Sequence, residues 1–266
     1  MWDKTALRQI LVIMREKKGI YMDNRKDLIS EKGRYIGVDG CKNGWVVAVI
    51  DSGKLNVENY DSITQIVESY PTFNQFLIDM AIGLQESAND IRPDTAARKM
   101  IKPRSSTIFP VPSRQAVYKD NETDQRKANI SILGKSLAKQ SMAIIPKIRE
   151  LDMFFDKHPE YKNVICESHP ELCFARLNNQ VVTSKKKDVE GINERIQILS
   201  KYIDIESLKD IRNFAKTIHC NPDDIIDAVC LAVTASMKNK GHCETVPDKP
   251  CKDARGLFMQ MVIPKI

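Results

Sequence analysis

The sequence lacks the marks of a membrane or secreted protein. None of its apolar runs approaches the ~20 residues that a membrane-spanning helix needs. The opening stretch, MWDKTALRQILVIMREKKG, is interrupted by charges and has no small-residue cleavage site, so it is a poor secretory signal. We therefore expect a cytoplasmic protein without a membrane partner.

Paired cysteines and zinc-binding spacings are also missing. The chain has seven cysteines, an odd number, and none of them forms a C-x-x-C pair. Four lie in or beside apolar segments, where a free thiol behaves as a small hydrophobic group: Cys41, Cys166, Cys173 and Cys230. The pattern predicts reduced, buried thiols.

Size and charge set the remaining bounds. A chain of 266 residues with 42% hydrophobic residues can bury one core in a single large domain. Its formal charge of +6 suits a nucleic-acid partner but is also found in ordinary enzymes. Basic residues concentrate in two places, between positions 92 and 114 and at positions 185–187. Nothing in the composition fixes the oligomeric state, so a homo-oligomer stays open.

Residues 1–33 form a charged extension before the domain at 34–266. Its apolar residues recur at helical spacing: Leu7, Ile10, Leu11 and Met14. The extension is either a short amphipathic helix that docks on the domain or a partner, or an untranslated stretch before a start at Met22.

The first half of the domain predicts a mixed α/β sheet. Residues 35–51 contain two β-rich runs joined by a turn at 42–44 with Asn and Gly, which predicts a hairpin. Residues 54–62 suit a third strand, and 62–73 a short helix. The segment 76–84, FLIDMAIGL, predicts a buried fourth strand parallel to the first. A polar, basic insertion follows at about 85–123, at the sheet edge where open α/β sheets bind ligands.

The second half is predicted to be mainly helical. Residues 124–157 show a helical stripe that Pro146 is expected to kink, and NVICESHPEL predicts a fifth strand with Glu167 at its exit. Further helices are expected at 188–202, at 206–218 and from Asn221 onward.

Acidic residues interrupt the apolar segments at Asp39, Asp79, Asp224 and Asp227. Burying a carboxylate is costly unless it is paired, protonated or bound to a metal. Asp39 precedes Gly40 and could be a turn residue, but the hairpin turn is better supplied by residues 42–44. Asp79 has only apolar neighbours and no turn chemistry. Only a buried polar partner or a metal would explain Asp79, and a divalent cation accounts for both acids.

The helix at Asn221 separates its acids by position. Asp223 and Asp224 lie in the first turn, where capping and the helix dipole explain a negative charge. Asp227 lies one turn further in, where capping does not explain it. Asp224 and Asp227 are three residues apart, so they share a helix face and can point at one cation.

An ordered series of segments resembles a known family from Arg34 to the C-terminus. The segments are IGVDGCKNGWVVA, LIDMAIGL, the stretch with Asp94, Ala97 and Arg98, RSSTIFPVPSR, GKSLAKQSMAIIPKI, CESHPEL, SKKKDVEGINERIQIL, DDIIDAVCLAVTA and DARGLFMQMVIP. They resemble the predicted RNase H-like nucleases of the domain of unknown function DUF429. The D-x-x-D-A-x-x-L-A helix is also similar to the last helix of Holliday-junction resolvases, in the same superfamily. The resemblance implies an RNase H-like five-stranded mixed sheet flanked by helices.

The resemblance also implies a two-metal nuclease. Mg²⁺ or Mn²⁺ would be held by Asp39, Asp79 and Asp227, with Glu167 and Asp224 as further catalytic acids. The expected partner is nucleic acid. Its phosphates are expected to meet a set of polar and basic side chains: Arg98, Arg104, Ser105, Ser106, Arg114, Lys135, Lys139 and His169.

Two other functions stay open at this stage. VDGCKNG is similar to the phosphate-binding turn of actin-like ATPases, although those proteins need two such domains and about 230 residues are too few for both. A non-catalytic nucleic-acid-binding or scaffold protein is the other alternative. Clustered carboxylates argue against it, because they repel phosphate.

Overall fold

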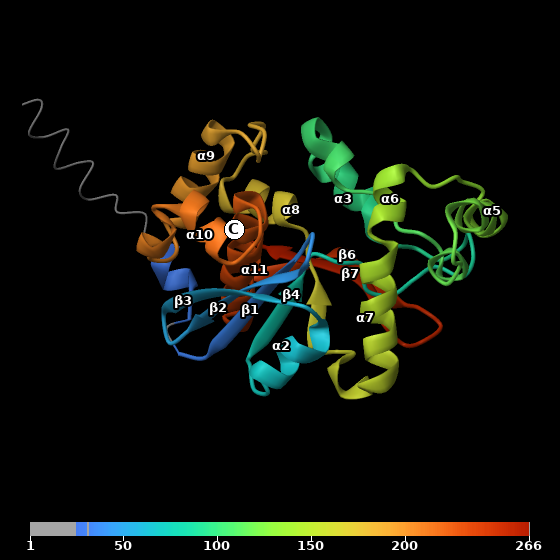
Figure 1. Cartoon of the computed structure of the whole chain (residues 1–266), viewed down its shortest axis with the longest axis horizontal. Helices are drawn as coiled ribbons and strands as arrows, with labels where there is room; N and C mark the ends of the chain where they lie inside the picture. Colours follow the sequence, from blue (N-terminus) through green and yellow to red (C-terminus); the bar gives the residue numbers. More distant parts are fainter. Residues whose placement is uncertain (1–24, 31, 266) are drawn as a thin grey trace, which may run out of the picture.

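A five-stranded sheet forms the centre of the molecule (Figure 1). The computed structural model describes residues 25–30 and 32–265. The strands are β1 (Arg34–Cys41), β2 (Gly44–Asp51), β3 (Lys54–Tyr60), β4 (Gln75–Ile78) and β5 (Ile165–Glu167), in the order β3-β2-β1-β4-β5. β1 to β3 pair antiparallel, whereas β4 runs parallel to β1 and to β5. This is the predicted mixed sheet, and it is consistent with an RNase H-like fold.

Helices cover both faces of the sheet. One face packs against α8 (Pro170–Leu177), α9 (Val189–Leu199), α10 (Ile211–Thr217) and α11 (Pro222–Asn239). The other face packs against α2 (Ile63–Ser69) and α7 (Ile145–Lys157). Strand side chains alternate between the two cores: Tyr35 and Leu77 face α11, whereas Ile36 and Ile78 face α7.

Gly37 allows α11 to lie directly on β1. A Cβ atom at this position would come within 2.2 Å of the backbone oxygen of Ala228 and the backbone nitrogen of Ala232. Only glycine permits such a close approach. Asp39 follows two residues later and so faces the same side of the sheet. The contact at Gly37 therefore places Asp39 beside the N-terminal turns of α11.

The predicted fourth strand is shorter than expected. β4 ends at Ile78, although the prediction ran from 76 to 84. The backbone N–H of Asp79 still donates to Val38 O at 2.9 Å, which holds this residue at the strand exit. Asp79 therefore lies at the carboxyl edge of the sheet and not within a strand.

Short helices fill the predicted insertion and the segment after it. They are α3 (Asp94–Met100), η2 (Lys102–Thr107), α4 (Arg114–Val117), α5 (Glu122–Leu133) and α6 (Lys139–Ala143). The single kinked helix predicted over 124–157 is wrong. α5 ends because Gly134 adopts a left-handed conformation with φ 66°, and Pro146 lies in the first turn of α7, where proline starts a helix without kinking it.

A C-terminal hairpin was not predicted. β6 (Cys243–Lys252) pairs antiparallel with β7 (Phe258–Pro264) and packs against α3 and α8. The helix α8 was also missed, because Pro170 opens it where a strand-exit turn was expected. Single turns complete the chain at η1 (Arg25–Leu28), η3 (Pro159–Tyr161) and η4 (Glu206–Leu208).

Part of the predicted N-terminal extension packs on the domain. Ile29 is buried in the core that contains α11, and the guanidinium of Arg25 donates to Leu177 O. The amphipathic segment predicted from Leu7 to Met14 lies outside the described residues. No helix in the described part of the chain is long and apolar enough to cross a membrane.

Candidate functional site

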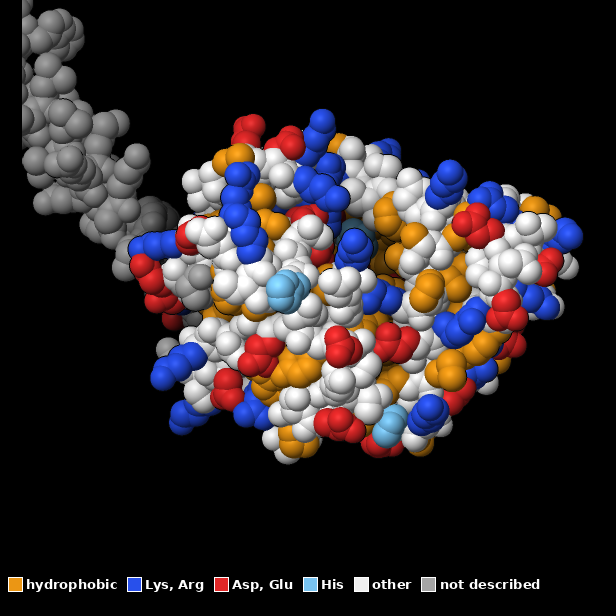
Figure 2. Space-filling model, viewed as in Figure 1, with side chains coloured by type: hydrophobic (Ala, Val, Ile, Leu, Met, Phe, Trp, Pro, Cys, Tyr) orange, Lys and Arg blue, Asp and Glu red, His pale blue; other side chains and the backbone are white. Residues whose placement is uncertain are grey.

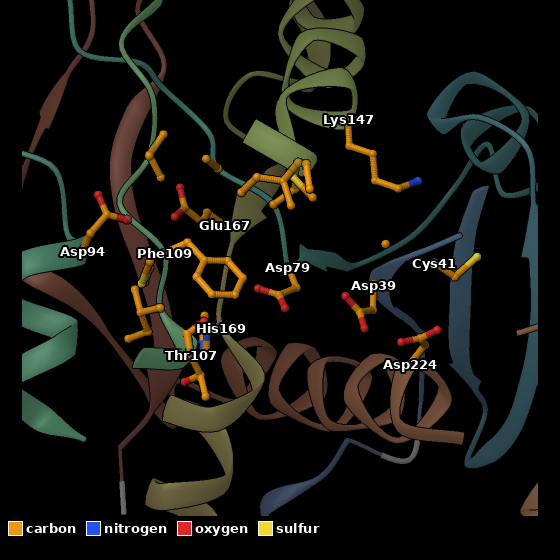
Figure 3. A pocket seen from close by; sticks show the side chains of 18 of the residues that line it. Asp39, Cys41, Asp79, Asp94, Thr107, Phe109, Lys147, Glu167, His169 and Asp224 are labelled. Carbon is orange, nitrogen blue, oxygen red and sulfur yellow. Dashed lines mark hydrogen bonds between the residues drawn. The ribbon is translucent and has the colours of Figure 1, made fainter. Parts of the chain in front are cut away.

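A cavity of about 350 Å³ opens at the carboxyl ends of β1 and β4 (Figure 3). Its acidic lining residues come from different elements: Asp39, Asp79, Asp94, Glu167 and Asp224. The basic lining residues are Lys147, His169 and Lys186. In Figure 3 the carboxylates of Asp39, Asp79 and Asp224 lie side by side above the end of α11.

Asp39 is a buried acid in the cavity lining. It is buried near the exit of β1, and burial raises its pKa well above the usual value. The negative charges of Asp79 and Asp227 raise the pKa further, while Lys186 lowers it. A carboxylate in this setting gains free energy from a nearby cation.

Asp79 and Asp224 share this environment. Burial raises the pKa of Asp79, and the charges of His169 and Lys186 oppose the shift. Burial also raises the pKa of Asp224, whose carboxylate accepts a 2.9 Å hydrogen bond from the side-chain amide of Asn221. Asp224 thus combines a helix-capping contact with a place in the cavity lining.

Asp227 lies below the cavity, one turn further along α11. Its side chain is 2% exposed, and one oxygen accepts a 2.6 Å hydrogen bond from Lys186 Nζ. The other oxygen, Oδ1, is buried without a hydrogen-bond partner among the described residues. Burial raises the pKa of Asp227 to about 6, although Lys186 lowers it. A buried carboxylate oxygen without a hydrogen-bond partner lowers the stability of the folded protein.

Lys186 was missed as a site residue. It lies in the basic run at 185–187, which was noted only for its charge. The loop that carries it packs on α9, where a Cβ at Gly191 would come within 2.0 Å of Lys185 O. Arg195 braces the same loop with a 3.3 Å hydrogen bond to Ser184 O. The run of three lysines could have signalled a cation that approaches the acids.

Glu167 belongs to a separate ion-pair group. Its carboxylate contacts Arg92 at 2.7 Å and accepts the backbone N–H of Ile82 at 2.7 Å. Arg92 also pairs with Asp94 at 3.0 Å. Burial raises the pKa of Glu167 to about 7, and Arg92 opposes the shift. Glu167 lines the cavity, but its charge is compensated by a buried guanidinium that the sequence did not single out.

His169 extends from the loop between β5 and α8 into the cavity. Its Nε2 lies 3.4 Å from Thr107 O, and its Nδ1 is buried without a hydrogen-bond partner in the described structure. An imidazole nitrogen with no partner is available to a ligand.

Other residues predicted to bind substrate lie further away. Arg98 and Lys135 line a neighbouring cavity of about 570 Å³, which shares Asp94 and Val111 with the first one. Arg104 is paired with Glu171 at 3.2 Å. The remaining predicted residues are absent from the described linings of both cavities: Ser105, Ser106, Arg114 and Lys139.

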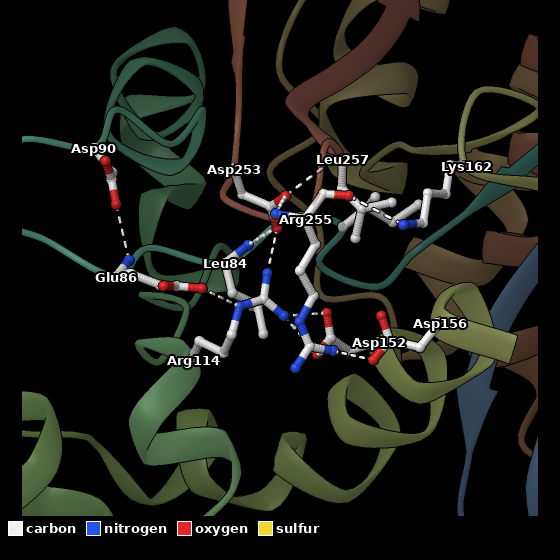
Figure 4. A network of polar contacts seen from close by, with 12 residues as sticks. Leu84, Glu86, Asp90, Arg114, Asp152, Asp156, Lys162, Asp253, Arg255 and Leu257 are labelled. Carbon is white, nitrogen blue, oxygen red and sulfur yellow. Dashed lines mark hydrogen bonds and ion pairs between the residues drawn. The ribbon is translucent and has the colours of Figure 1, made fainter. Parts of the chain in front are cut away.

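Arg114 is engaged in a buried network of its own (Figure 4). It donates to Asp152 at 2.5 Å, to Glu86 at 2.7 Å and to Asp253. Asp152 also pairs with Arg255. Each of the three guanidinium nitrogens of Arg114 donates to a carboxylate of the protein itself, which argues against a role in phosphate binding.

The acids surround the cavity without forming a preassembled metal group. Across residues 25–30 and 32–265, no three His, Cys, Asp or Glu side chains stand close enough to hold a metal as they are. The donor chemistry nevertheless suits a hard cation, because the candidates are carboxylate oxygens from β1, the β4 exit and α11. The orphaned Oδ1 of Asp227 and the raised pKa of Asp39 both indicate missing positive charge.

The surrounding surface is mixed in charge. Figure 2 shows Lys and Arg side chains interspersed with Asp and Glu, and basic side chains near a hollow at the centre of this face. Positive charge is thus present near the cavity without a broad basic field.

The chain belongs to the DUF429 family. The model of this family, described as a protein of unknown function, matches residues 37–252. This range includes all the acids that surround the cavity. No curated protein and no solved structure matches the chain significantly.

Proposed function

We propose that the protein is a divalent-metal-dependent phosphodiester hydrolase that acts on nucleic acid. The observation that carries the proposal is the presence of Asp39, Asp79 and Asp224 in the lining of one cavity, with the buried Asp227 close enough to Asp39 to raise its pKa. Burial raises the pKa of each of these acids, and neighbouring acids raise the pKa of Asp39 and Asp227 further, as is common at functional sites.

Mg²⁺ or Mn²⁺ is the cofactor that these ligands would favour. Asp39 and Asp79 would hold it together with an acid of α11. When bound, a hard divalent cation supplies Lewis-acid stabilisation of phosphate charge and activation of the attacking water, by a one-metal or two-metal route. The acids would draw together around the ion, because their mutual repulsion is relieved by its charge.

The basic lining residues would position the phosphodiester. Lys147 and His169 both line the cavity, but the ammonium of Lys147 donates to Gly44 O and lies over the Trp45 ring. His169, whose Nδ1 has no partner in the described structure, is therefore the stronger candidate to bond a phosphate oxygen. The neighbouring cavity would place Arg98 and Lys135 along a longer strand. This arrangement favours an extended polynucleotide over a small phosphoester.

The single large sheet suits a nuclease better than an actin-like ATPase. The described residues contain one five-stranded sheet and one two-stranded sheet, and no second copy of the larger one. A cytoplasmic location agrees with seven free cysteines, since reduced thiols persist in a reducing compartment.

Hydrolysis assays on a substrate panel test the proposal. The panel contains RNA, DNA, RNA–DNA hybrids and four-way junctions, each with EDTA, Mg²⁺ or Mn²⁺. We expect wild-type protein to cleave at least one substrate only with a divalent cation, and Asp39→Asn to be inactive. Asp61→Asn removes an exposed acid near α2 and is the matched control. Absence of cleavage across the panel, together with absence of Mn²⁺ binding, would refute the proposal.

A further inference from the structure

Lys186 already supplies one positive charge to the acidic cluster. Its Nζ lies 2.6 Å from Asp227 and 3.7 Å from Asp223, so it contacts α11 at two acids. Its side chain is 33% exposed and lines the cavity. The ammonium group therefore reaches from the cavity surface down to the buried carboxylate.

Because of this contact, Asp227 and Asp224 of α11 have different environments. Asp227 is covered by Lys186 and is absent from the described cavity lining, whereas Asp224 lines the cavity. A cation that enters from the cavity meets Asp39, Asp79 and Asp224 first. To reach Asp227 it would have to displace an ammonium group held in a buried, charge-assisted hydrogen bond.

The loop that carries Lys186 is held in place. Arg195 is 1% exposed, donates to Ser184 O and pairs with Glu171 at 2.8 Å. The close contact of Gly191 with Lys185 O fixes the other side of the loop. These contacts hold the backbone on either side of Lys186, so the base of its side chain stays beside α11 and its ammonium group stays within reach of Asp227.

We infer that Lys186 is the resident cation of this site, so that the chain holds a single divalent ion between Asp39, Asp79 and Asp224. Asp227 is then a positioning residue that holds Lys186 and not a metal ligand. The inference rests on the proposed function and sharpens it, because it replaces the second metal ion of the expected mechanism with a side chain. In that place, Lys186 Nζ supplies its charge to the substrate phosphate.

Titration calorimetry with MnCl₂ tests the inference without a substrate. Wild-type protein is expected to bind one Mn²⁺ per chain. In Lys186→Met the freed Asp227 becomes available, and the stoichiometry is expected to rise to two. Lys187→Met removes an exposed neighbouring charge and should remain at one. Native mass spectrometry of the same samples gives an independent count.

Asp227→Asn supplies a second test if Lys186→Met fails to fold. As a positioning residue, Asp227 can lose its charge while one Mn²⁺ still binds, with an affinity within about tenfold of wild type, the lower end of the effect of an outer-shell change. Asp224→Asn should weaken binding far more. If Asp227→Asn instead weakened Mn²⁺ binding more than Asp224→Asn does, the inference would be overturned.

The outcomes separate the two proposals. Two Mn²⁺ ions in wild-type protein, or an unchanged count in a folded Lys186→Met, would overturn the role of Lys186 and leave the nuclease intact. No Mn²⁺ binding by any variant would remove the proposed function itself, and the inference with it.

Discussion

Two groups of buried charge in this molecule differ in how they are compensated. Around Arg114, each acid faces a guanidinium: Asp152 contacts Arg114 and Arg255, and Asp253 contacts Arg114 (Figure 4). At the acidic cavity, in contrast, Asp39, Asp79 and Asp227 share the charge of one lysine, Lys186. Compensated charges hold elements together, whereas acids left short of positive charge mark a place for a ligand.

We expect the largest effect on cleavage from a substitution at Asp79, one of the acids in the cavity. Asp79→Asn keeps the side-chain shape but removes the charge that would bind a cation. Loss of several kcal/mol of metal-based stabilisation corresponds to a fall in cleavage rate on the order of 10³-fold. Thermal stability without metal should be unchanged or higher, because repulsion from neighbouring acids is relieved.

Paired measurements of cleavage and thermal unfolding check this prediction. A variant that both loses activity and unfolds would assign Asp79 a structural role, and the binding-module alternative would then replace the nuclease. Wild-type protein in EDTA provides the control for activity without a metal.

Arg114→Met tests the buried network in which Arg114 pairs with Asp152 and Asp253. Removal of one partner from a buried ion pair leaves uncompensated charge and costs about 3–5 kcal/mol. Asp152 and Asp253 would both lose a guanidinium, so urea unfolding should show this loss of stability. Arg126→Met breaks a surface pair with Glu122 and should cost less than about 1 kcal/mol. An equal loss of unfolding free energy in the two variants would mean that the Arg114 network stabilises the fold no more than a surface ion pair does.

The sheet was predictable because its signals are local. Two β-rich runs within 35–51 and the turn at 42–44 specified the first hairpin, and the apolar run before Asp79 specified the central parallel strand. The hairpin at 243–264 was not predictable in this way. Charged and proline residues interrupt β6, and packing against α3 and α8 stabilises it as a strand.

The site was predictable in part for the same reason. A carboxylate in an apolar run is visible in sequence, so Asp39, Asp79 and Asp227 could be singled out. Their counter-charges could not, because Arg92 and Lys186 reach the acids only through tertiary folding. Arg114 showed the opposite error: its position in a basic stretch suggested phosphate binding, but its partners lie far away in sequence at Asp152 and Asp253.

The pH dependence of stability gives a smaller, signed effect. Asp227 has a pKa raised from 3.8 to about 6, so the folded state holds its proton where the unfolded state has released it. This group therefore favours folding below about pH 4, and its contribution is lost as the pH rises to about 6. Asp227→Asn removes the effect. The stability of this variant relative to wild type should rise across that range by at most about 3 kcal/mol.

Urea unfolding of both proteins in EDTA, at steps between pH 4 and pH 7, checks the sign. Asp61→Asn, which changes an exposed acid, should show no such trend relative to wild type. A relative stability that falls as the pH rises would mean that Lys186 compensates Asp227 fully, and the contrast with the Arg114 network would disappear.

The smallest effect is expected at the neighbouring cavity. Arg98→Gln and Lys135→Gln each remove one positive charge that would contact the phosphate backbone of a longer strand. For a single strand, each lost contact should reduce the slope of log K against log salt by about 0.7. Binding of an oligonucleotide should weaken, whereas cleavage of a dinucleotide, which reaches only the acidic cavity, should be unchanged. Lys54→Gln alters an exposed lysine at the start of β3 and serves as the control. If the two cavity variants match this control in fluorescence-anisotropy titrations, the strand does not cross the neighbouring cavity, and the substrate is confined to the space around Asp39 and Asp79.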